Sequence, residues 1–339
     1  MLVAVTEEKE ARERYWGVAQ ESRTRELVTT LGPKGRGELG VILPHEHVFL
    51  DLRTWESPEH SATEKEDVVR RVAPEISRAR KAGVTAIVEP TTLGVGRRAD
   101  VLAAVSEATG MPLVAPTGVY REPWIPPWVH RAAPEELRDW MIGELLGSIE
   151  GTGVRAGWIK VSAGDEGLTE TETKVLRAAA EAAAATNAVI GSHTVRGWVA
   201  MKQLDVLEAA GLSPERFVWI HAQREPDFSL HLTAARRGAW LEYDGIGRRR
   251  IPQGSDDTFV GLVKNALQSG LADRLLLSGD VLGYDASLPN GGEVEAYTYL
   301  CETFLPKLVA AGVDEVTVRR LTVDNPFDAF ARCDTPRQP

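Results

Sequence analysis

Residues 41–47 read Val-Ile-Leu-Pro-His-Glu-His, a short apolar run that ends at Pro44 and is followed closely by two histidines, His45 and His47. An apolar run of this length is typical of a buried parallel strand. An open, doubly wound sheet normally has a glycine-rich turn after its first strand. Histidines in that place favour the other common parallel architecture, a (β/α)8 barrel.

The same unit of short apolar run, loop and helix-like stretch recurs along the chain. After residues 41–44, further strands are expected at residues 84–90, 113–116, 157–161, 188–192, 217–220, 239–243 and 274–278. Helices are expected between them at residues 65–82, 134–150, 169–186, 199–210 and 258–270. Alternating strands and helices imply a parallel sheet, and eight such units imply an α/β fold of the (β/α)8 TIM-barrel type.

The chain length fits two domains or one large barrel. At roughly 150 residues per domain, length alone gives about two domains, but a single barrel of about 250 residues or more is equally allowed. The eight strand candidates favour one barrel, which we place at residues 26–333. Residues 1–25 are dense in charge and are expected to form a short N-terminal extension, with a C-terminal tail at residues 334–339.

Composition and charge exclude several functional classes. The chain has 49 acidic and 39 basic residues, a net charge of −10, whereas a nucleic-acid binder normally carries a basic face. No stretch reaches the roughly 18 apolar residues that span a bilayer, and the N-terminus lacks the pattern of a secretory signal. The two cysteines suggest a reducing compartment. We expect a cytoplasmic protein that acts on a small molecule, without nucleic-acid or membrane partners.

Metal-binding residue types stand at the expected carboxyl ends of several strands, where barrels of this type carry their chemistry. Side chains two apart on a strand point the same way, so His45 and His47 can both face the barrel axis. Lys160 lies on strand four, and the other candidates stand at the ends of strands five, six and eight: His193, His221 and Asp280. A lone histidine at a strand end is more often a packing residue, but this convergence favours a metal site.

Lys160 needs a separate interpretation, because an ammonium group beside divalent cations would be repelled. A buried, neutral lysine can take up carbon dioxide and become an anionic carbamate with two oxygens. The residues themselves leave open whether Lys160 does this or has a different role.

Other residues near the strand ends suggest a substrate pocket. Tyr120 and Trp124 lie in a proline-rich loop after strand three and can form an apolar wall. Arg248 and Arg249 follow strand seven and can hold an anionic group, or belong to a solvated surface run. For Asp244 three roles are open: it can orient a metal ligand, relay a proton or form a salt bridge with an arginine. Glu89, at the end of strand two, supports a metal ligand or forms a salt bridge in the barrel.

In combination, these motifs resemble the phosphotriesterase family of the amidohydrolase superfamily over residues 27–330. The resemblance rests on motifs in the family's order: Leu-Pro-His45-Glu46-His47, Pro90-Thr-Thr-Leu-Gly94, Thr117-Gly-Val-Tyr120, Ile159-Lys160-Val161, Ser192-His193-Thr194, Ile220-His221, Ser278-Gly279-Asp280, Asn290-Gly-Gly292 and Asp324-Asn-Pro326.

The resemblance implies two divalent metal ions, commonly Zn²⁺, with Mn²⁺, Co²⁺ or Fe²⁺ as alternatives. His45, His47 and Asp280 would bind the more buried ion, and His193 and His221 the more exposed one. Lys160, as a carbamate, would bridge the two ions together with a hydroxide. That hydroxide would attack a carbonyl or phosphoryl centre, and Asp280 would collect the proton. Homodimers are common among such proteins, so a homodimer is one assembly that the resemblance implies.

Three departures from the family pattern put the substrate in doubt. Arg224 and its neighbours stand after His221 where many relatives have an acidic residue. Asp244 is not followed by the His or Arg of organophosphate hydrolases and acyl-homoserine lactonases. The loop after Asp280 lacks the arginine of relatives that act on phosphorylated sugar lactones.

The leading hypothesis is hydrolysis of a lactone or related carboxylic ester, with organophosphate triesters as a side activity. A phosphotriester hydrolase and a phosphorylated sugar lactonase are the alternatives within the family. Outside it, a non-catalytic ligand-binding barrel would be expected to lose ligands that are all present here. An aldolase that forms a Schiff base on Lys160 would not need the four histidines.

Overall fold

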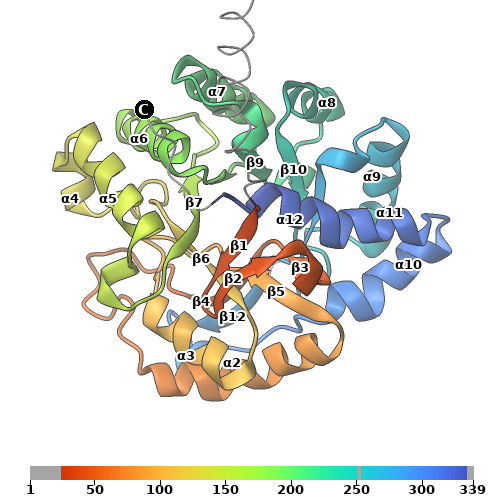
Figure 1. Cartoon of the computed structure of the whole chain (residues 1–339), viewed down its shortest axis with the longest axis horizontal. Coiled ribbons are helices and arrows are strands. Elements are labelled where there is room, and N and C mark those ends of the chain that lie inside the picture. The colour runs from red at the N-terminus through yellow and green to blue at the C-terminus, as the bar shows by residue number, and fades with distance from the viewer. Residues whose placement is uncertain (1–23, 250–252, 334–339) are drawn as a thin grey trace, which may run out of the picture.

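The computed structural model describes residues 24–249 and 253–333. Most of the expected N-terminal extension, the whole expected C-terminal tail and Arg250 lie outside these residues. Within them, a ring of helices surrounds a central group of strands (Figure 1). None of the helices in the described part of the chain is both long and apolar enough to cross a bilayer.

The eight expected strands are all present and confirm the predicted barrel. In chain order they are β3 (Val41–Leu43), β5 (Val84–Val88), β6 (Leu113–Thr117), β7 (Ala156–Ser162), β8 (Ile190–His193), β9 (Phe217–Ile220), β10 (Trp240–Tyr243) and β11 (Leu275–Leu277). Each strand pairs in parallel with the next in the sheet. Parallel neighbours in chain order place all the carboxyl ends at one end of the barrel.

Two further strands, β4 (Glu46–Leu50) and β12 (Val281–Asp285), pair in parallel between the first and last strands of the sheet. They continue β3 and β11 beyond His45 and Asp280, and the backbone N–H of Asp280 donates to the carbonyl oxygen of His45 over 3.1 Å. The sequence analysis did not predict them, because polar residues interrupt the apolar run at these points. They join the two edges of the ring beside the candidate ligands.

Helices cover the outside of the barrel. The five expected ones are α2 (Lys65–Lys81), α5 (Pro134–Leu146), α6 (Glu170–Thr186), α7 (Gly197–Ala209) and α9 (Asp256–Gln268). Others were not predicted: α3 (Ala99–Thr109), α4 (Pro127–Arg131), α8 (Phe228–Arg237), α10 (Leu305–Ala310), α11 (Glu315–Arg319) and α12 (Asn325–Phe330). α6 begins at a capping box, in which Thr169 Oγ1 accepts from the N–H of Glu172 over 3.2 Å. α9 begins before residue 258, because Ser255 caps its first turn.

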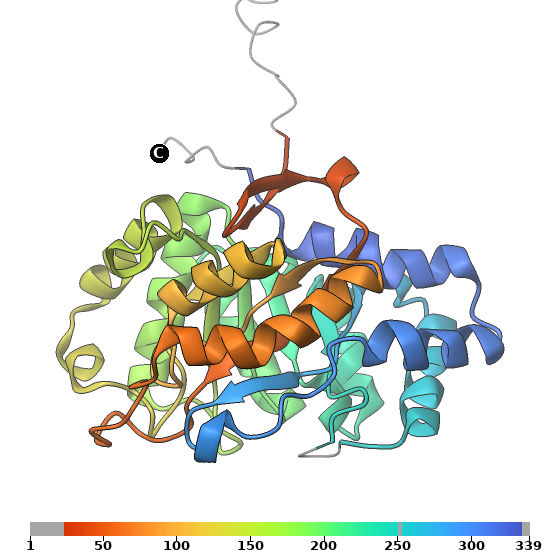
Figure 2. The same cartoon turned by 90° about the horizontal axis from the view of Figure 1, so that it is seen from below.

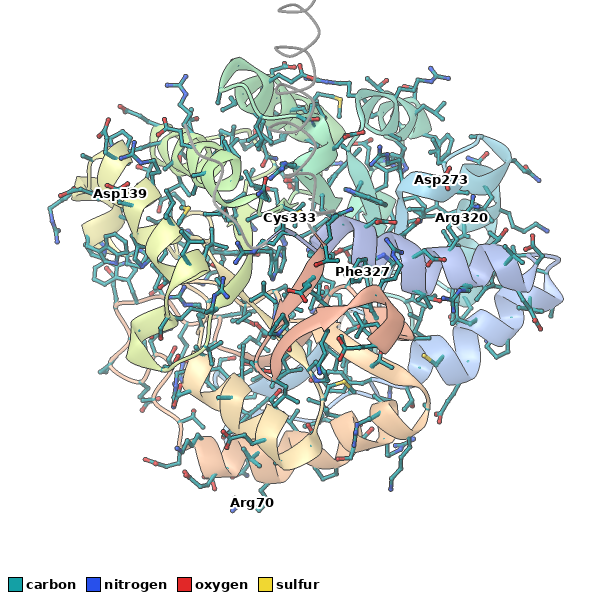
Figure 3. All side chains as sticks on the ribbon, viewed as in Figure 1. Arg70, Asp139, Asp273, Arg320, Phe327 and Cys333 are labelled. Atoms are coloured by element: carbon teal, nitrogen blue, oxygen red, sulfur yellow. The ribbon has the colours of Figure 1, made fainter. Side chains whose placement is uncertain are left out.

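A β-hairpin closes the amino-terminal end of the barrel (Figure 2). Its antiparallel strands, β1 (Glu26–Thr29) and β2 (Gly32–Gly35), were not predicted. Leu27 is fully buried there, and the Thr30 N–H donates to the carbonyl oxygen of Leu113 over 2.9 Å. Phe327 of α12, labelled in Figure 3, lies beside the hairpin with the Arg36 guanidinium 4.4 Å from its ring centre. The opposite end is therefore the one available for a site.

Successive strand residues pack into two different cores, as strand alternation requires. One core fills the barrel and includes Ile42, Val88, Trp158 and Ile220. The other lies between the strands and the surrounding helices. Gly191 makes room in the barrel, because a Cβ at this position would lie 2.5 Å from the Trp158 ring.

Candidate metal centre

All six residues predicted as metal ligands line one cavity of about 570 Å³ at the carboxyl ends of the strands. These residues are His45, His47, Lys160, His193, His221 and Asp280. They come from distant parts of the chain, and the barrel closure brings the first and last of them together. Four of the residues that line the cavity are histidines.

His45, His47 and Asp280 form one compact group of possible ligands. The Nε2 atoms of His45 and His47 lie 3.6 and 3.5 Å from Oδ1 of Asp280. Ligand atoms bound at about 2.0–2.1 Å to one tetrahedral ion lie about 3.3 Å apart. The spacing of these three side chains therefore fits a divalent ion.

His193 and His221 form the second group. Nδ1 of His193 and Nε2 of His221 face each other at 2.7 Å, and the ring centres are 4.4 Å apart. Both residues line the same cavity, so their ring nitrogens are candidate ligands for a second ion. This pair of imidazoles matches the ligands that the sequence analysis expected for the more exposed of two metal ions.

Three of the four histidines are oriented by a partner on Nδ1, which leaves Nε2 for the cavity. Nδ1 of His45 lies 2.6 Å from Oε1 of Glu242, and Nδ1 of His221 lies 2.6 Å from Oδ1 of Asp244. Nδ1 of His47 lies 2.7 Å from Oγ1 of Thr91. Such partners fix the tautomer of a metal-binding histidine and raise its basicity.

Glu242 is a residue of the candidate centre that the sequence analysis missed. It is fully buried on β10, and its second oxygen, Oε2, has no hydrogen-bond partner in the described structure. The available signal was its position on the expected strand, two residues before Asp244, which follows the strand directly; in extended chain this spacing places both carboxylates on one face. Glu89 also reaches the centre, because its Oε1 accepts from Thr91 Oγ1 over 2.5 Å, next to His47.

Burial favours the neutral forms of His45, His193 and Lys160. It lowers the pKa of His45 and of His193 well below 6.5, and neighbouring positive charges lower both further. Burial also lowers the pKa of Lys160 to about 8, against the opposing effect of Glu242 and other carboxylates. Neutral imidazoles bind metals, and a neutral amine is the form of lysine that can react with carbon dioxide.

The predicted substrate residues lie at different distances from the cavity. Tyr120 lines it, with its hydroxyl 3.2 Å from Nδ1 of His193. Trp124 packs behind Tyr120, with ring centres 5.6 Å apart, and donates from Nε1 to the Leu52 carbonyl oxygen. It is not among the residues that line the cavity. The wall predicted from these aromatics therefore consists of Tyr120, supported by Trp124.

The fold places the two predicted arginines and Asp244 in different surroundings. Arg248 lines the cavity and forms an ion pair with Asp280. Arg249 points elsewhere, with a side chain 71% exposed and 3.5 Å from Glu293. Asp244 is fully buried and holds His221, the ligand-orienting role that was one of the alternatives.

Three polar residues that were not predicted as site residues line the cavity: Gln223, Arg224 and Gln253. Gln223 donates from Nε2 to the carboxylate of Asp244 over 2.9 Å and to Oε1 of Gln253 over 2.7 Å. These contacts connect the turn after β9 with the loop after β10. The proximity of Gln223 and Arg224 to His221 was the signal in the sequence.

Fold and site together define a (β/α)8 barrel with a candidate metal centre at the carboxyl ends of its strands. Comparison with known families identifies the protein family to which this barrel belongs. The chain belongs to the phosphotriesterase family, whose model matches residues 25–330. This confirms the resemblance found in the sequence and makes the chain a hydrolase of a metal-dependent family.

Individual relatives cover most of the chain. The phosphotriesterase homology protein of Mycobacterium tuberculosis H37Rv is 31% identical, over 91% of this chain and 98% of its own length. The aryldialkylphosphatase of Saccharolobus solfataricus is 28% identical, over 87% and 96%. The crystal structure of a mutant PTE-like lactonase of Deinococcus radiodurans superposes with a TM-score of 0.81 and 27% identity, over 89% of this chain and 99% of that chain.

Proposed function

We propose that this protein is a binuclear metal-dependent hydrolase that opens a lactone or a related carboxylic ester. The observation that carries the proposal is the pair of ligand groups in one cavity, with the spacing of His45 and His47 from Asp280 that one ion requires. Two divalent ions, when bound, would supply an acidic water molecule and polarise the acyl oxygen of the substrate.

The chain's own residues would hold and assist these ions. His45, His47 and Asp280 would hold one ion, His193 and His221 the other, and a carbamate on Lys160 would bridge the pair. Asp280 belongs to a possible ligand group with His45 and His47 and to another with His221, so its carboxylate is the candidate base for the proton of the attacking water. The hydroxyl of Tyr120, beside His193, is placed to donate to an oxygen of the bound substrate.

Similarity to a lactonase structure favours the lactone over other esters. The aryldialkylphosphatase relative supports organophosphate triesters as a side activity or as the alternative main activity. The two activities share a centre because a tetrahedral phosphorus resembles the tetrahedral intermediate of lactone opening. A phosphorylated sugar lactone remains the third candidate, tested in the same screen.

The first test combines metal analysis with a substrate screen. We expect purified protein to contain about two divalent ions per chain, and zinc- or manganese-loaded protein to hydrolyse lactones, plain or phosphorylated, better than paraoxon-like triesters. Better turnover of the triesters would favour the alternative. Protein without divalent metal, whose activity a chelator leaves unchanged, would refute the metal mechanism.

A second test addresses Lys160. Lys160→Ala should lose the bridge and most of the activity, since the two ions would lose their shared ligand. Part of the activity should return with an added short carboxylate such as acetate or propionate. Mass spectrometry of the intact protein at high bicarbonate should also show one carbon dioxide adduct that the variant lacks. Normal activity of Lys160→Ala would contradict the carbamate.

A further inference from the structure

The mouth of the cavity carries positive charge that the proposed hydrolysis does not use. Arg224 and Arg248 both line the cavity, and they come from consecutive loops, after β9 and β10. The whole chain has a net charge of −10. Two guanidinium groups in one cavity of an acidic protein point to a ligand of opposite charge.

Arg224 has no internal ion pair in the described residues. It is exposed, lies one short turn after the ligand His221, and its N–H donates to the His221 carbonyl oxygen over 3.0 Å. The neighbouring carboxylate does not neutralise it, because Glu225 accepts from the backbone N–H groups of Gly197 and Asp227 over 2.8 and 2.9 Å. The Arg224 guanidinium therefore stays available to a bound molecule.

Arg248 adds a second, more buried donor. Its side chain is only 11% exposed and pairs with Asp280, while its Nε has no hydrogen-bond partner in the described structure. A buried guanidinium nitrogen without a partner is costly, so an acceptor at this point would be stabilising. Both guanidinium groups can therefore donate hydrogen bonds to an anion at the cavity mouth.

The lining of the cavity also includes apolar side chains. They come from β4, from the chain just after β4 and after β5, and from β12: Leu50, Leu52, Pro90, Val95 and Leu282. The same cavity thus offers candidate metal ligands, guanidinium groups and an apolar surface to a bound molecule.

We infer that the substrate carries a group that is anionic at neutral pH, a carboxylate, sulfonate or phosphate, which Arg224 and Arg248 hold at the cavity mouth. Its remaining part is apolar and packs against the leucines. This inference rests on the proposed hydrolytic function and specifies the class of substrate. Charge-assisted hydrogen bonds from guanidinium to such groups are stronger than neutral ones.

Arg224 is the better position for a test, because Arg248 also contacts Asp280. The substrates are a γ-butyrolactone with a carboxylate side chain and its carboxamide, which has nearly the same shape without the charge. In the metal-loaded wild type, we expect kcat/KM for the carboxylate to exceed that for the carboxamide by about tenfold or more. In Arg224→Gln this ratio should fall toward one, mainly through KM.

Arg236→Gln is the matched control, since Arg236 is exposed on α8 and outside the cavity. It removes the same charge and should keep the wild-type ratio. Sulfonated and phosphorylated counterparts, measured in the same way, identify the preferred anion. A wild type without preference for charge, or an Arg224→Gln variant that keeps the preference, would overturn the inference.

Binding distinguishes failure of this inference from failure of the proposed function. Calorimetry of the metal-loaded protein with glutarate, propanesulfonate and propyl phosphate needs no turnover. If no lactone is hydrolysed, the proposed function fails. The anion site would still be supported by binding that Arg224→Gln weakens about tenfold and Arg236→Gln does not. Equal binding by all three proteins would refute it.

Discussion

At the scale of single residues, the candidate metal centre depends on side chains that never enter the cavity. Glu242, Thr91 and Asp244 each hold the Nδ1 atom of one histidine, at 2.6, 2.7 and 2.6 Å. Each contact leaves Nε2 of the ring directed at the cavity. The precision of the centre therefore comes from the barrel interior as well as from the ligands themselves.

Glu242 provides a direct test of this orientation. Glu242→Ala should weaken metal binding about 10–100-fold, because His45 loses the partner that fixes its ring. Glu242→Gln should lose less, since its amide oxygen can still accept from His45 Nδ1–H. Competition with a chromophoric chelator measures the affinity, and circular dichroism checks the fold. Unchanged affinity in the folded alanine variant would show that Glu242 does not orient His45.

At the scale of secondary-structure elements, buried polar contacts connect helices to the barrel. Arg97, just before α3, pairs with Glu144 of α5 at 2.6 Å, and both side chains are nearly inaccessible, at 2% and 5% exposure. Thr117 at the end of β6 also donates to Glu144 over 2.6 Å. One carboxylate thus joins two helices and a strand on one side of the barrel.

Breaking this buried pair should be costly. Glu144→Gln leaves Arg97 with only the half-exposed Glu150 as an anionic partner, so we expect a loss of about 3–5 kcal/mol in the free energy of unfolding. Urea denaturation measures it. Asp139→Asn, which breaks an exposed pair with Arg138, should cost less than about 1 kcal/mol. If both variants lost a similar amount of unfolding free energy, burial would not be the reason that the Arg97–Glu144 pair is costly to break.

His231 connects α8 to β10 and should make stability depend on pH. Its Nδ1 accepts from the Tyr243 hydroxyl at 2.7 Å, and its Nε2 lies 3.1 Å from the Glu225 carbonyl oxygen. Burial lowers the pKa of His231 below 6.5. The unfolded chain therefore binds this proton first as the pH falls. The contribution of neutral His231 to the free energy of unfolding is therefore fully present above about pH 6.5, and it is lost as the pH falls toward the folded-state pKa.

The measurement compares urea denaturation of metal-free protein at pH 7.5 and pH 5. His231 should contribute about 1.4 kcal/mol to the wild-type loss for each pH unit that separates its two pKa values, in addition to the loss from the buried histidines of the candidate metal centre. His231→Gln should show a smaller loss over the same range, although it is less stable at pH 7.5. An equal pH dependence of both proteins would exclude His231 as its source.

At the scale of the whole molecule, the two ends of the barrel have different tasks. The hairpin and α12 close the amino-terminal end, whereas the candidate metal centre lies at the carboxyl ends of the strands (Figure 2). Leu27 of the hairpin is fully buried in the barrel core with Trp158 and Phe330. Substitutions in the hairpin should therefore change stability without changing the chemistry.

Leu27→Ala should lower the free energy of unfolding by about 2–5 kcal/mol, because it leaves a cavity in the barrel core. Leu31→Ala, in the turn of the same hairpin, is the control, because Leu31 is 38% exposed. Its effect should stay within about 0.5 kcal/mol. Both variants should keep the wild-type kcat below their melting temperatures, and a large fall in kcat for Leu27→Ala would show that the two ends are coupled.

The sequence by itself determined the repeating strand-and-helix order and the six candidate ligands. Short apolar runs mark buried strands, and the candidate ligands stand on these runs or directly after them, so both features are local. The ends of α9 and the unexpected hairpin show the limit of local patterns. Helix caps and short glycine-containing strands have only weak sequence signals, and tertiary packing decides where these elements form.

Only the tertiary structure decided which distant residues meet. Glu242 and His45 are 197 positions apart, and their contact exists because β10 and the chain after β3 point side chains into the same barrel. The pairing of β4 with β12 likewise joins the two ends of the sheet. Arg248 and Arg249 are adjacent and chemically identical, yet one lines the cavity and the other faces solvent. Their difference is one of backbone direction, which the order of residues does not specify.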